Sequence, residues 1–405
     1  MTRLASLLLV LLLALTAACG EDGMDGSLDM GPVDMATEPE LADELFAPGP
    51  FAAGYQERLE VTYTPVGGTG ERTVPLSVWY PADPGSAEVV TYQVAGLSSV
   101  QVAGTSLDAP PVAEGNFPVA VYSHGSGGLA LVGYPYGELL ASHGWIVVAP
   151  DHVGNTATDG LLGRLDSFVR IALHRPQDVS AALDWLEGGA ADAGLDGAAD
   201  LDNVLAFGHS FGGYTTFAVA GAAIDGDALA ADCDARGDCD EYTPEVVAAF
   251  NAGLGDPRVD AIVPQAPAVV TAFAEGALSG LSQPVMLQTG RLDATTTQEG
   301  QAVPFWAGLG RDDDVWVEMP TGAHFTFLTI CSDLDTPTLN LFQPDATMDG
   351  CNAEGEMTFL PDAEAVPVLA AYLLAYARLH VLGEEALREV VEGPALDDRF
   401  VLTVP

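Results

Sequence analysis

From about residue 55 onward, nearly continuous apolar runs alternate with segments in which apolar residues recur at helical spacing. The apolar runs are FPVAVYSHG (117–125), WIVVAP (145–150), NVLAFGH (203–209), RVDAIVPQAP (258–267), QPVMLQTG (283–290) and DVWVEMP (314–320). A strand that is apolar throughout is buried on both faces, and such strands joined by helices form parallel sheets. The chain is therefore predicted to be an α/β protein with a mostly parallel central sheet flanked by helices.

The segments at the two ends of this alternation complete the expected architecture. RLEVTYTPV (58–66) and RTVPLSVWYP (72–81) predict an antiparallel hairpin ahead of the parallel strands. The spacing of apolar residues predicts an amphipathic helix over 175–189 and a long closing helix over 365–382. Residues 223–257 and 326–362 interrupt the alternation, and we interpret them as insertions in one folded domain over 48–405.

The N-terminal segment has the pattern of an export signal. An apolar run over residues 4–18 follows Arg3 and ends in small residues before Cys19, which predicts a signal peptide over 1–18. LTAAC (15–19) resembles a bacterial lipobox, so we expect Cys19 to carry a lipid anchor. Plain secretion and a single membrane anchor are the alternatives. Residues 19–47 are acidic and rich in Gly, Asp and Pro, and we interpret them as a disordered tether.

The overall charge argues against nucleic acid as a partner. The formal net charge is −45, and all 13 basic residues are arginine. Phosphate backbones are bound by clustered lysine and arginine, which this chain lacks.

The cysteines fit an exported chain. Besides Cys19 there are four, which allow three pairings. Cys233–Cys239 and Cys331–Cys351 are favoured because each pair would close one polar loop inside one insertion. No histidine lies at ligand spacing beside them, so no metal site is predicted. The acidic run at 225–241 is an alternative Ca²⁺ site, but it lacks EF-hand spacing, and a solvated surface is the preferred interpretation.

GHSFG (208–212) stands between an apolar strand and a helical pattern. This is the Gly-x-Ser-x-Gly arrangement, in which a tight strand-to-helix turn presents a serine as a nucleophile. Gly208, His209 and Gly212 would form the turn around Ser210, and the glycines are needed where strand and helix approach too closely for a Cβ. An ordinary glycine-rich turn with an incidental serine is the alternative.

A serine nucleophile needs a base and a carboxylate that orients the base. Of the seven histidines, His324 in GAHF follows the last predicted strand, late in the chain, where this order of residues requires it. Asp293 follows the strand before it and lies between Ser210 and His324 in sequence. Asp260 begins a strand and would therefore face the opposite edge of the sheet.

The negative oxygen formed during acyl transfer needs backbone N–H donors. Phe211, the residue after the serine, would supply one. SHGSGG (123–128) follows an earlier strand and would supply a second, from Ser126. Neighbouring residues at strand ends are candidates for the pocket: His124, Gly125, Asp151 and His152. For Asp151 and His152, a structural hydrogen bond is an equally good explanation.

With these motifs the chain resembles the α/β-hydrolase superfamily over residues 55–382. It is most similar to the bacterial branch of predicted dienelactone hydrolases and platelet-activating-factor acetylhydrolases. The resemblance rests on YSHGSGG (122–128), APDHVGNT (149–156), RPQDVSAALDWL (175–186), GHSFGGYT (208–215) and GAHFTF (322–327).

Two departures qualify what the resemblance implies. Dienelactone hydrolases use a cysteine nucleophile, whereas this chain has Ser210, so that substrate is not implied. The acetylhydrolases place their acid after the strand that follows the nucleophile helix, but that strand ends here in VPQAPAVV (263–270), without a carboxylate. Asp293, on the next strand, is then similar to the acid of bacterial polyester hydrolases and cutinases.

The sequence thus predicts an exported serine hydrolase that cleaves carboxylic esters with Ser210, His324 and Asp293 and needs no cofactor. Its expected substrate is a small-molecule or polymeric ester. Polyester or polyhydroxyalkanoate depolymerisation is a second enzymatic hypothesis, and a non-catalytic surface-binding module on a hydrolase fold is a third.

Overall fold

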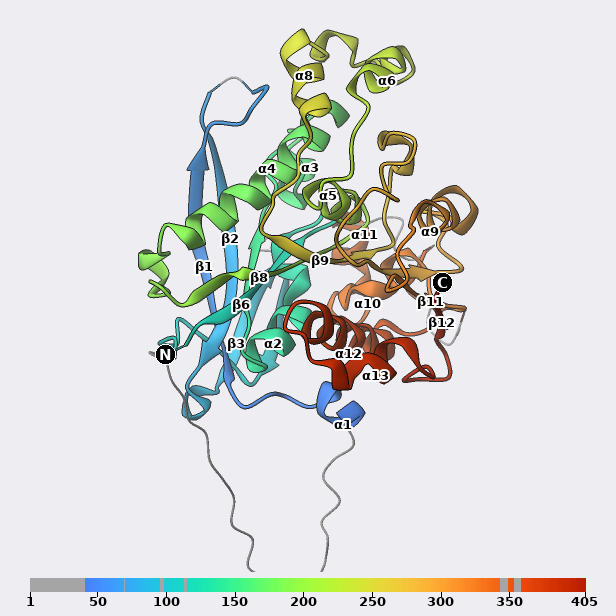
Figure 1. Cartoon of the computed structure of the whole chain (residues 1–405). Helices are drawn as coiled ribbons and strands as arrows, with labels where there is room; N and C mark the ends of the chain where they lie inside the picture. The colour runs from blue at the N-terminus through green and yellow to red at the C-terminus, as the bar shows by residue number, and fades with distance from the viewer. Residues whose placement is uncertain (1–40, 69, 95–97, 113–114, 343–348, 353–357) are drawn as a thin grey trace, which may run out of the picture. The chain divides into compact units, whose positions relative to one another are not determined.

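The computed structural model describes residues 41–405 except 69, 95–97, 113–114, 343–348 and 353–357 (Figure 1). The predicted signal peptide, Cys19 and most of the predicted tether lie outside the described residues. The last part of that tether does not: residues 41–46 form helix α1 (Leu41–Phe46), and Leu45 is fully buried in the core. The folded unit therefore begins before residue 48, because Leu45 fills an apolar site that the acidic composition of this segment conceals.

The core is a ten-stranded sheet in the order β12-β11-β10-β9-β8-β6-β7-β2-β1-β5. The strands are β1 (Ala52–Tyr63), β2 (Arg72–Ala82), β5 (Thr105–Leu107), β6 (Phe117–Ser123), β7 (Ile146–Pro150), β8 (Ala199–His209), β9 (Val259–Gln265), β10 (Met286–Gly290), β11 (Val315–Met319) and β12 (Val401–Thr403). Strands β6 to β11 pair in parallel, which confirms the predicted fold class. The predicted hairpin of β1 and β2 is also confirmed, and β2 pairs antiparallel with β7.

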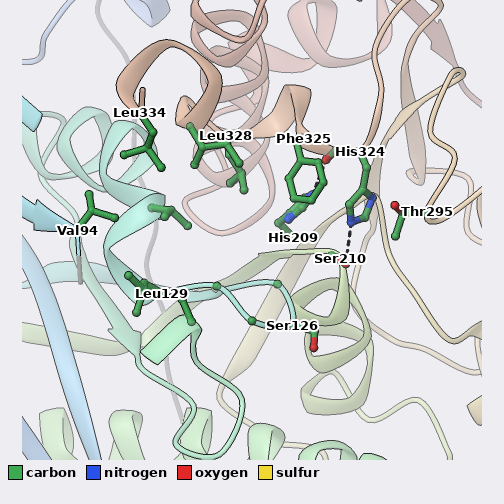
Figure 2. A pocket seen from close by; sticks show the side chains of 16 residues that line it. Val94, Ser126, Leu129, His209, Ser210, Thr295, His324, Phe325, Leu328 and Leu334 are labelled. Carbon is green, nitrogen blue, oxygen red and sulfur yellow. Dashed lines mark hydrogen bonds between the residues drawn. The ribbon is translucent and has the colours of Figure 1, made fainter. Parts of the chain in front are cut away.

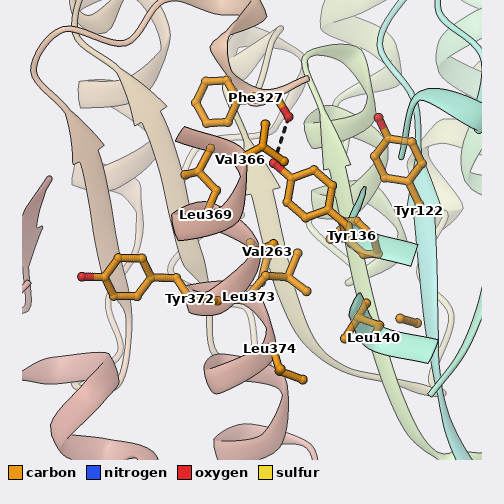
Figure 3. Close-up of a cluster of buried hydrophobic side chains, with 14 of the residues drawn as sticks. Tyr122, Tyr136, Leu140, Val263, Phe327, Val366, Leu369, Tyr372, Leu373 and Leu374 are labelled. Carbon is orange, nitrogen blue, oxygen red and sulfur yellow. Dashed lines mark hydrogen bonds between the residues drawn. The ribbon is translucent and has the colours of Figure 1, made fainter. Parts of the chain in front are cut away.

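Helices cover both faces of this sheet, as nearly continuous apolar strands require. One face carries α1, α2 (Tyr134–Ser142), α12 (Asp362–His380) and α13 (Arg388–Glu392); the other carries α4 (Phe168–Glu187), α5 (Phe211–Val219) and α9 (Val303–Gly308). Figure 3 shows the first face, where Leu369 and Leu373 of α12 pack beside Tyr136 of α2 over Val263 of β9. The Tyr136 hydroxyl donates to the Phe327 carbonyl at 2.8 Å, so this core also holds the turn that carries His324.

Helix α4 begins seven residues before the predicted start, with Ser167 as its N-cap, and contains Pro176. A proline inside a helix cannot donate to the carbonyl four residues earlier. That carbonyl, of Ala172, instead accepts from the Tyr214 hydroxyl of α5 at 3.1 Å. The missing helical hydrogen bond is thus replaced by one that ties α4 to the helix after Ser210.

Several short elements had no clear sequence signal. They are the separate hairpin β3 (Val89–Val94) and β4 (Ser98–Ala103), strands β5 and β12, and α3 (Ala157–Leu161). Single 3-10 turns lie at Pro84–Ser86, Ala130–Gly133, Ala191–Ala193, Cys239–Glu241, Val270–Ala272, His324–Phe327 and Glu385–Leu387, and one π-helical turn lies at Gln298–Ala302.

Both predicted disulfides, Cys233–Cys239 and Cys331–Cys351, are present. The first insertion contains α6 (Gly226–Ala231), α7 (Cys233–Arg236) and α8 (Pro244–Ala252), and the second contains α10 (Ile330–Asp333) and α11 (Thr336–Phe342). Among the described residues, none of the helices has the length and apolar character needed to cross a membrane.

A half-buried carboxyl group links α2 to β3 and β5. One oxygen of Glu138 accepts from the Tyr92 hydroxyl at 2.7 Å and from the Thr105 hydroxyl at 2.8 Å. The Tyr92 oxygen in turn accepts from the Trp79 indole N–H at 2.9 Å. Burial raises the pKa of Glu138 to about 7, against the lowering effect of these two hydroxyl donors.

We expect Glu138 to make the fold less stable as the pH rises. The folded-state pKa lies above the unfolded value, so between about pH 4.5 and 7 the folded protein holds the proton that the unfolded chain has released. The loss is at most about 1.4 kcal/mol per pH unit. Glu138→Gln removes this titration. In urea unfolding, its free energy of unfolding minus that of wild type should therefore be larger at pH 8 than at pH 5. Parallel pH profiles for the two proteins would contradict this.

Candidate active site

Four loops meet at the carboxyl-terminal edge of the sheet. Ser210 follows β8, residues 124–128 follow β6, Asp293 follows β10 and His324 follows β11. Since parallel strands end at the same edge, residues far apart in sequence converge there. Asp260, the other acid considered from the sequence, lies in β9 near its start, and its carboxylate accepts from the Val204 N–H at 2.8 Å.

Ser210 occupies a strained backbone conformation between β8 and α5, with φ 58° and ψ −118°. Non-glycine residues rarely have positive φ, and such strain occurs where surrounding packing enforces it. The packing here is unusually close: a Cβ on Gly212 would lie 1.9 Å from the Ser123 carbonyl oxygen, and one on Gly208 would lie 2.6 Å from the same atom. The two glycines let the end of β6 pass directly against the turn that presents Ser210.

Ser210, His324 and Asp293 form one hydrogen-bonded chain. The Ser210 Oγ lies 3.0 Å from His324 Nε2, and His324 Nδ1 lies 2.8 Å from Asp293 Oδ2 (Figure 2 shows the first contact). All three side chains are buried, with Ser210 9% exposed. In this arrangement the imidazole Nδ1–H donates to the carboxylate, and Nε2 is free to accept the serine proton.

Asp293 is held as an acceptor by its own loop. It accepts from the Thr296 N–H at 2.6 Å, the Thr296 hydroxyl at 2.7 Å and the Thr295 N–H at 2.9 Å. Burial opposes ionisation of this carboxyl, but its hydrogen bonds with His324 and Thr296 outweigh burial and lower its pKa. Asp293 is therefore a fixed negative charge beside the imidazole.

A second buried carboxylate, Asp349, was not found from the sequence. Its Oδ1 accepts from the His324 N–H at 3.2 Å and the Ala294 N–H at 3.0 Å, and its Oδ2 accepts from the Thr295 hydroxyl at 2.6 Å. It thus joins the loop of Asp293 to the loop of His324. Asp349 lies in the second insertion, two residues before disulfide-bonded Cys351, and that proximity is the one signal the sequence offered.

His209, the residue before Ser210, supports the same turn from inside. Its Nε2–H donates to the His324 carbonyl at 2.7 Å, and the two rings lie 4.7 Å apart. Burial, reinforced by the nearby His324, lowers the pKa of His209 to about 3. His209 is therefore neutral at physiological pH and acts as a hydrogen-bond donor.

The two predicted donors for a negative oxygen lie on either side of the turn. Phe211 is the first residue of α5, where an N–H has no acceptor within the helix. Ser126 lies on the loop after β6, and its hydroxyl accepts from the Asn155 side-chain amide at 2.9 Å. Gly125, between β6 and Ser126, packs so closely that a Cβ there would lie 3.3 Å from the Ser210 Cβ.

A cavity of about 190 Å³ opens onto Ser210 and His324. Figure 2 shows Val94, Leu129, Leu328 and Leu334 together on the side of the cavity away from Thr295. The remaining lining residues are Gly125, Ser126, Gly127, Gly128, Val132, Ala157, His209, Phe325 and Ile330. The wall is thus apolar apart from the groups around Ser210.

Of the four predicted pocket residues, only Gly125 is among the residues that line this cavity; His124 and His152 are fully buried, and Asp151 is half-buried. His124 Nδ1–H donates to the Gly125 carbonyl at 2.7 Å, and its Nε2 accepts from the His152 N–H at 3.0 Å. Asp151 accepts from the Ala130 N–H at 2.7 Å. These polar atoms are engaged in holding neighbouring strand ends together, which directs them away from the cavity.

The first insertion brings Cys233, Asp234 and Cys239 close together, but the two cysteines are joined in a disulfide and offer no thiolate to a metal.

Comparison with known proteins supports a hydrolase. Residues 82–231, a little over a third of the chain, match the chlorophyllase family, an ester-hydrolase family of the α/β-hydrolase type. The matched segment contains Ser210 and the loop of Ser126 but ends before Asp293 and His324. No curated protein matches the chain.

From the contacts of Asp349 we predict that it fixes the His324 loop relative to the Asp293 loop. We expect Asp349→Ala to lower kcat/KM for p-nitrophenyl butyrate about 10- to 100-fold, since misplacement of a catalytic group by about 1 Å has effects of this size. Asp312→Ala, which removes an exposed carboxylate, is the matched control and should retain full activity. Equal activity of the Asp349 variant and wild type would exclude this role.

Proposed function

We propose that the protein is a serine hydrolase that cleaves carboxylic esters, with Ser210 as nucleophile, His324 as general base and acid, and Asp293 as the residue that orients His324. The observation that carries this proposal is the chain of contacts from Ser210 Oγ to His324 at 3.0 Å and from His324 to Asp293 at 2.8 Å. The strained turn under Ser210 and the apolar cavity in front of it give independent support.

The proposed reaction has two stages. The Ser210 oxygen attacks the ester carbonyl carbon while His324 Nε2 takes the serine proton, and the carbonyl oxygen becomes negative. His324 then gives this proton to the leaving alcohol, and an acyl-serine remains. A water molecule, deprotonated by His324, attacks the acyl-serine and releases the acid. Asp293 stabilises the imidazolium that forms in each stage.

The negative oxygen would be held by the N–H groups of Phe211 and Ser126. Such donors act most strongly when the protein fixes them before the substrate arrives. Phe211 is fixed by helix α5, and Ser126 by its contact with Asn155. No cofactor is needed for this chemistry.

The cavity favours an apolar acyl group of moderate size. Its side opposite Thr295 is formed by aliphatic residues, and its volume of about 190 Å³ is below the range typical of pockets for drug-sized ligands. An exposed aromatic surface beside the site would favour a polymer chain as substrate. Phe325 is the one Phe, Tyr or Trp among the described residues that line this cavity. We therefore favour small-molecule esters over polyesters.

The finer relationship proposed from the sequence, to dienelactone hydrolases and platelet-activating-factor acetylhydrolases, rests on its motifs alone. Export is supported by the two disulfides, which form in oxidising compartments. We propose that the mature protein is held at the cell envelope through a lipidated Cys19. A non-catalytic binding module would not need the Ser210–His324–Asp293 chain.

The proposal is tested by initial hydrolysis rates on p-nitrophenyl esters from acetate to palmitate. Ser210→Ala should abolish turnover of every ester, while Ser279→Ala, at an exposed serine, should retain it. Within the size of the cavity, each added methylene should raise kcat/KM about fourfold, since burial of one methylene contributes about 0.8 kcal/mol. The optimum is expected at acyl chains of about four to eight carbons, given the small cavity.

Turnover that persists in Ser210→Ala would show that Ser210 is not the nucleophile. A folded wild-type protein that hydrolyses none of the esters would contradict the proposed activity.

A further inference from the structure

A fully buried arginine lies behind the loop that carries Ser126. Arg175, on α4, is 1% exposed, and it makes no ion pair with a carboxylate among the described residues. Its Nε also has no hydrogen-bond partner within the described part of the chain. A buried charge without a direct counter-ion destabilises the fold, so stability alone does not account for an arginine at this position.

One end of the Arg175 guanidinium reaches the end of β6 and the loop after it, and the other end reaches Asn155, which follows β7. One terminal nitrogen donates to the His124 carbonyl and, at 3.2 Å, to the Ser123 hydroxyl oxygen. The other donates to the Asn155 side-chain carbonyl at 2.6 Å. Arg175 therefore binds the last residue of β6 and the first residue of the loop directly.

Asn155 carries this contact to the middle of the loop. Its side-chain amide donates to the Ser126 hydroxyl at 2.9 Å, and its backbone carbonyl accepts from the Gly127 N–H at 3.0 Å. The orientation of the Ser126 peptide thus depends on Asn155, and the orientation of the Asn155 amide depends on Arg175.

The same guanidinium lies over the ring of Phe211, with 5.2 Å between its central carbon and the ring centroid. Phe211 and Ser126 are the two donors proposed for the negative oxygen. One cation therefore packs against the Phe211 ring directly and is linked to Ser126 through Asn155.

Behind Arg175 stands a second hydrogen-bonded set of Ser, His and Asp. Ser123 Oγ lies 2.9 Å from His152 Nε2, and His152 Nδ1 lies 2.9 Å from Asp178 Oδ2. Its chemistry differs from that of Ser210, because Ser123 accepts a hydrogen bond from Arg175, and none of the three residues lines the cavity. All three are buried, so no ester could reach the serine.

The charges of this set fix its hydrogen-bond directions. Burial opposes ionisation of Asp178, but its bonds with Arg72 and His152 lower its pKa to about 2. Burial, with Arg175 nearby, lowers the pKa of His152 to about 3. His152 is thus neutral: its Nδ1–H donates to Asp178, its Nε2 accepts from Ser123, and the Ser123 oxygen faces Arg175.

We propose that Arg175 is a positioning residue that holds the N–H group of Ser126 toward the oxyanion through Asn155, packs against Phe211, and stabilises the negative oxygen with its buried charge. The Ser123–His152–Asp178 set orients Arg175 for this role. This inference rests on the proposed function. Arg175 and Asp178 stand three residues apart on α4, which places both on the face turned toward the loop.

The test compares Arg175→Met, which removes the charge at similar length, with wild type on p-nitrophenyl butyrate. We expect kcat to fall about 10²- to 10³-fold, as for loss of one oxyanion donor, with KM changed less than about threefold. Arg175→Lys keeps the charge without the planar fork and should recover part of the loss. Arg258→Met is the control. Arg258 forms an ion pair with Asp184 of α4, the helix that carries Arg175, and this variant should retain the wild-type kcat.

A second readout separates positioning of the oxyanion from a purely structural role. A trifluoromethyl ketone binds by adding its carbonyl carbon to the Ser210 oxygen, with the serine proton passing to His324 and a negative oxygen left in the site. Its inhibition constant should rise in Arg175→Met by the same factor by which kcat/KM falls. The matching methyl ketone, which binds without this addition, should keep its affinity within about threefold.

Several outcomes would overturn the inference. A folded Arg175→Met with kcat within threefold of wild type would do so, as would equal loss of affinity for both ketones. If Arg175→Met does not fold, Asn155→Ala decides, since it removes the side-chain link between Arg175 and Ser126 and leaves the charge of Arg175 in place. A loss of about tenfold in kcat supports the role, and unchanged kcat refutes it. Wild-type protein without Ser210-dependent turnover would instead refute the proposed function, and this inference with it.

Discussion

The closest approach in the candidate site is between the end of β6 and the turn that presents Ser210. A Cβ on Gly212 would overlap the Ser123 carbonyl oxygen, at 1.9 Å, so only glycine allows the strand and the helix to meet there. This approach places the loop of residues 123–128 beside Ser210 and brings Ser126 and Phe211 to the same small region. The positive φ of Ser210 is the backbone cost of the arrangement. The cavity, the proposed oxyanion donors and the Arg175 contacts all depend on this one packing constraint.

Local patterns were sufficient to predict the parts of the site that lie at strand ends. The apolar strands fix the direction of the sheet, so Ser210, Asp293 and His324 could be expected at one edge from their positions after successive strands. The glycines of GHSFG have a steric meaning that holds in any strand-to-helix turn. For the same reason the leading hairpin and both local disulfides could be anticipated.

The residues that the sequence did not reveal act through contacts between distant segments. Asp349 lies in an insertion with no periodic pattern, and its role appears only where the loops of His324 and Asp293 meet around it. Val94 reaches the cavity from a small hairpin outside the main sheet. Asp151 and His152 stand at a strand end, as pocket residues would, but their side chains bind neighbouring strand ends and do not line the cavity. Position along a strand does not tell which side of a loop a side chain faces.

The two sets of Ser, His and Asp show that surroundings decide chemistry. Both sets have contacts of about 3 Å, and both histidines face a carboxylate. Ser210 opens onto an apolar cavity, near the N–H groups proposed to stabilise a negative oxygen. Ser123 is enclosed, and it accepts a hydrogen bond from a buried cation. The proposed function assigns nucleophilic chemistry to the first set and a supporting role to the second.

This assignment is tested most directly by covalent labelling followed by peptide mapping. The native protein would be treated with a fluorophosphonate, digested, and each serine-containing peptide examined by mass spectrometry for the phosphonate adduct. The account predicts a single adduct on Ser210, with the peptide of Ser123 unmodified. An adduct on Ser123 or another serine, or a native protein that carries no adduct at all, would contradict it.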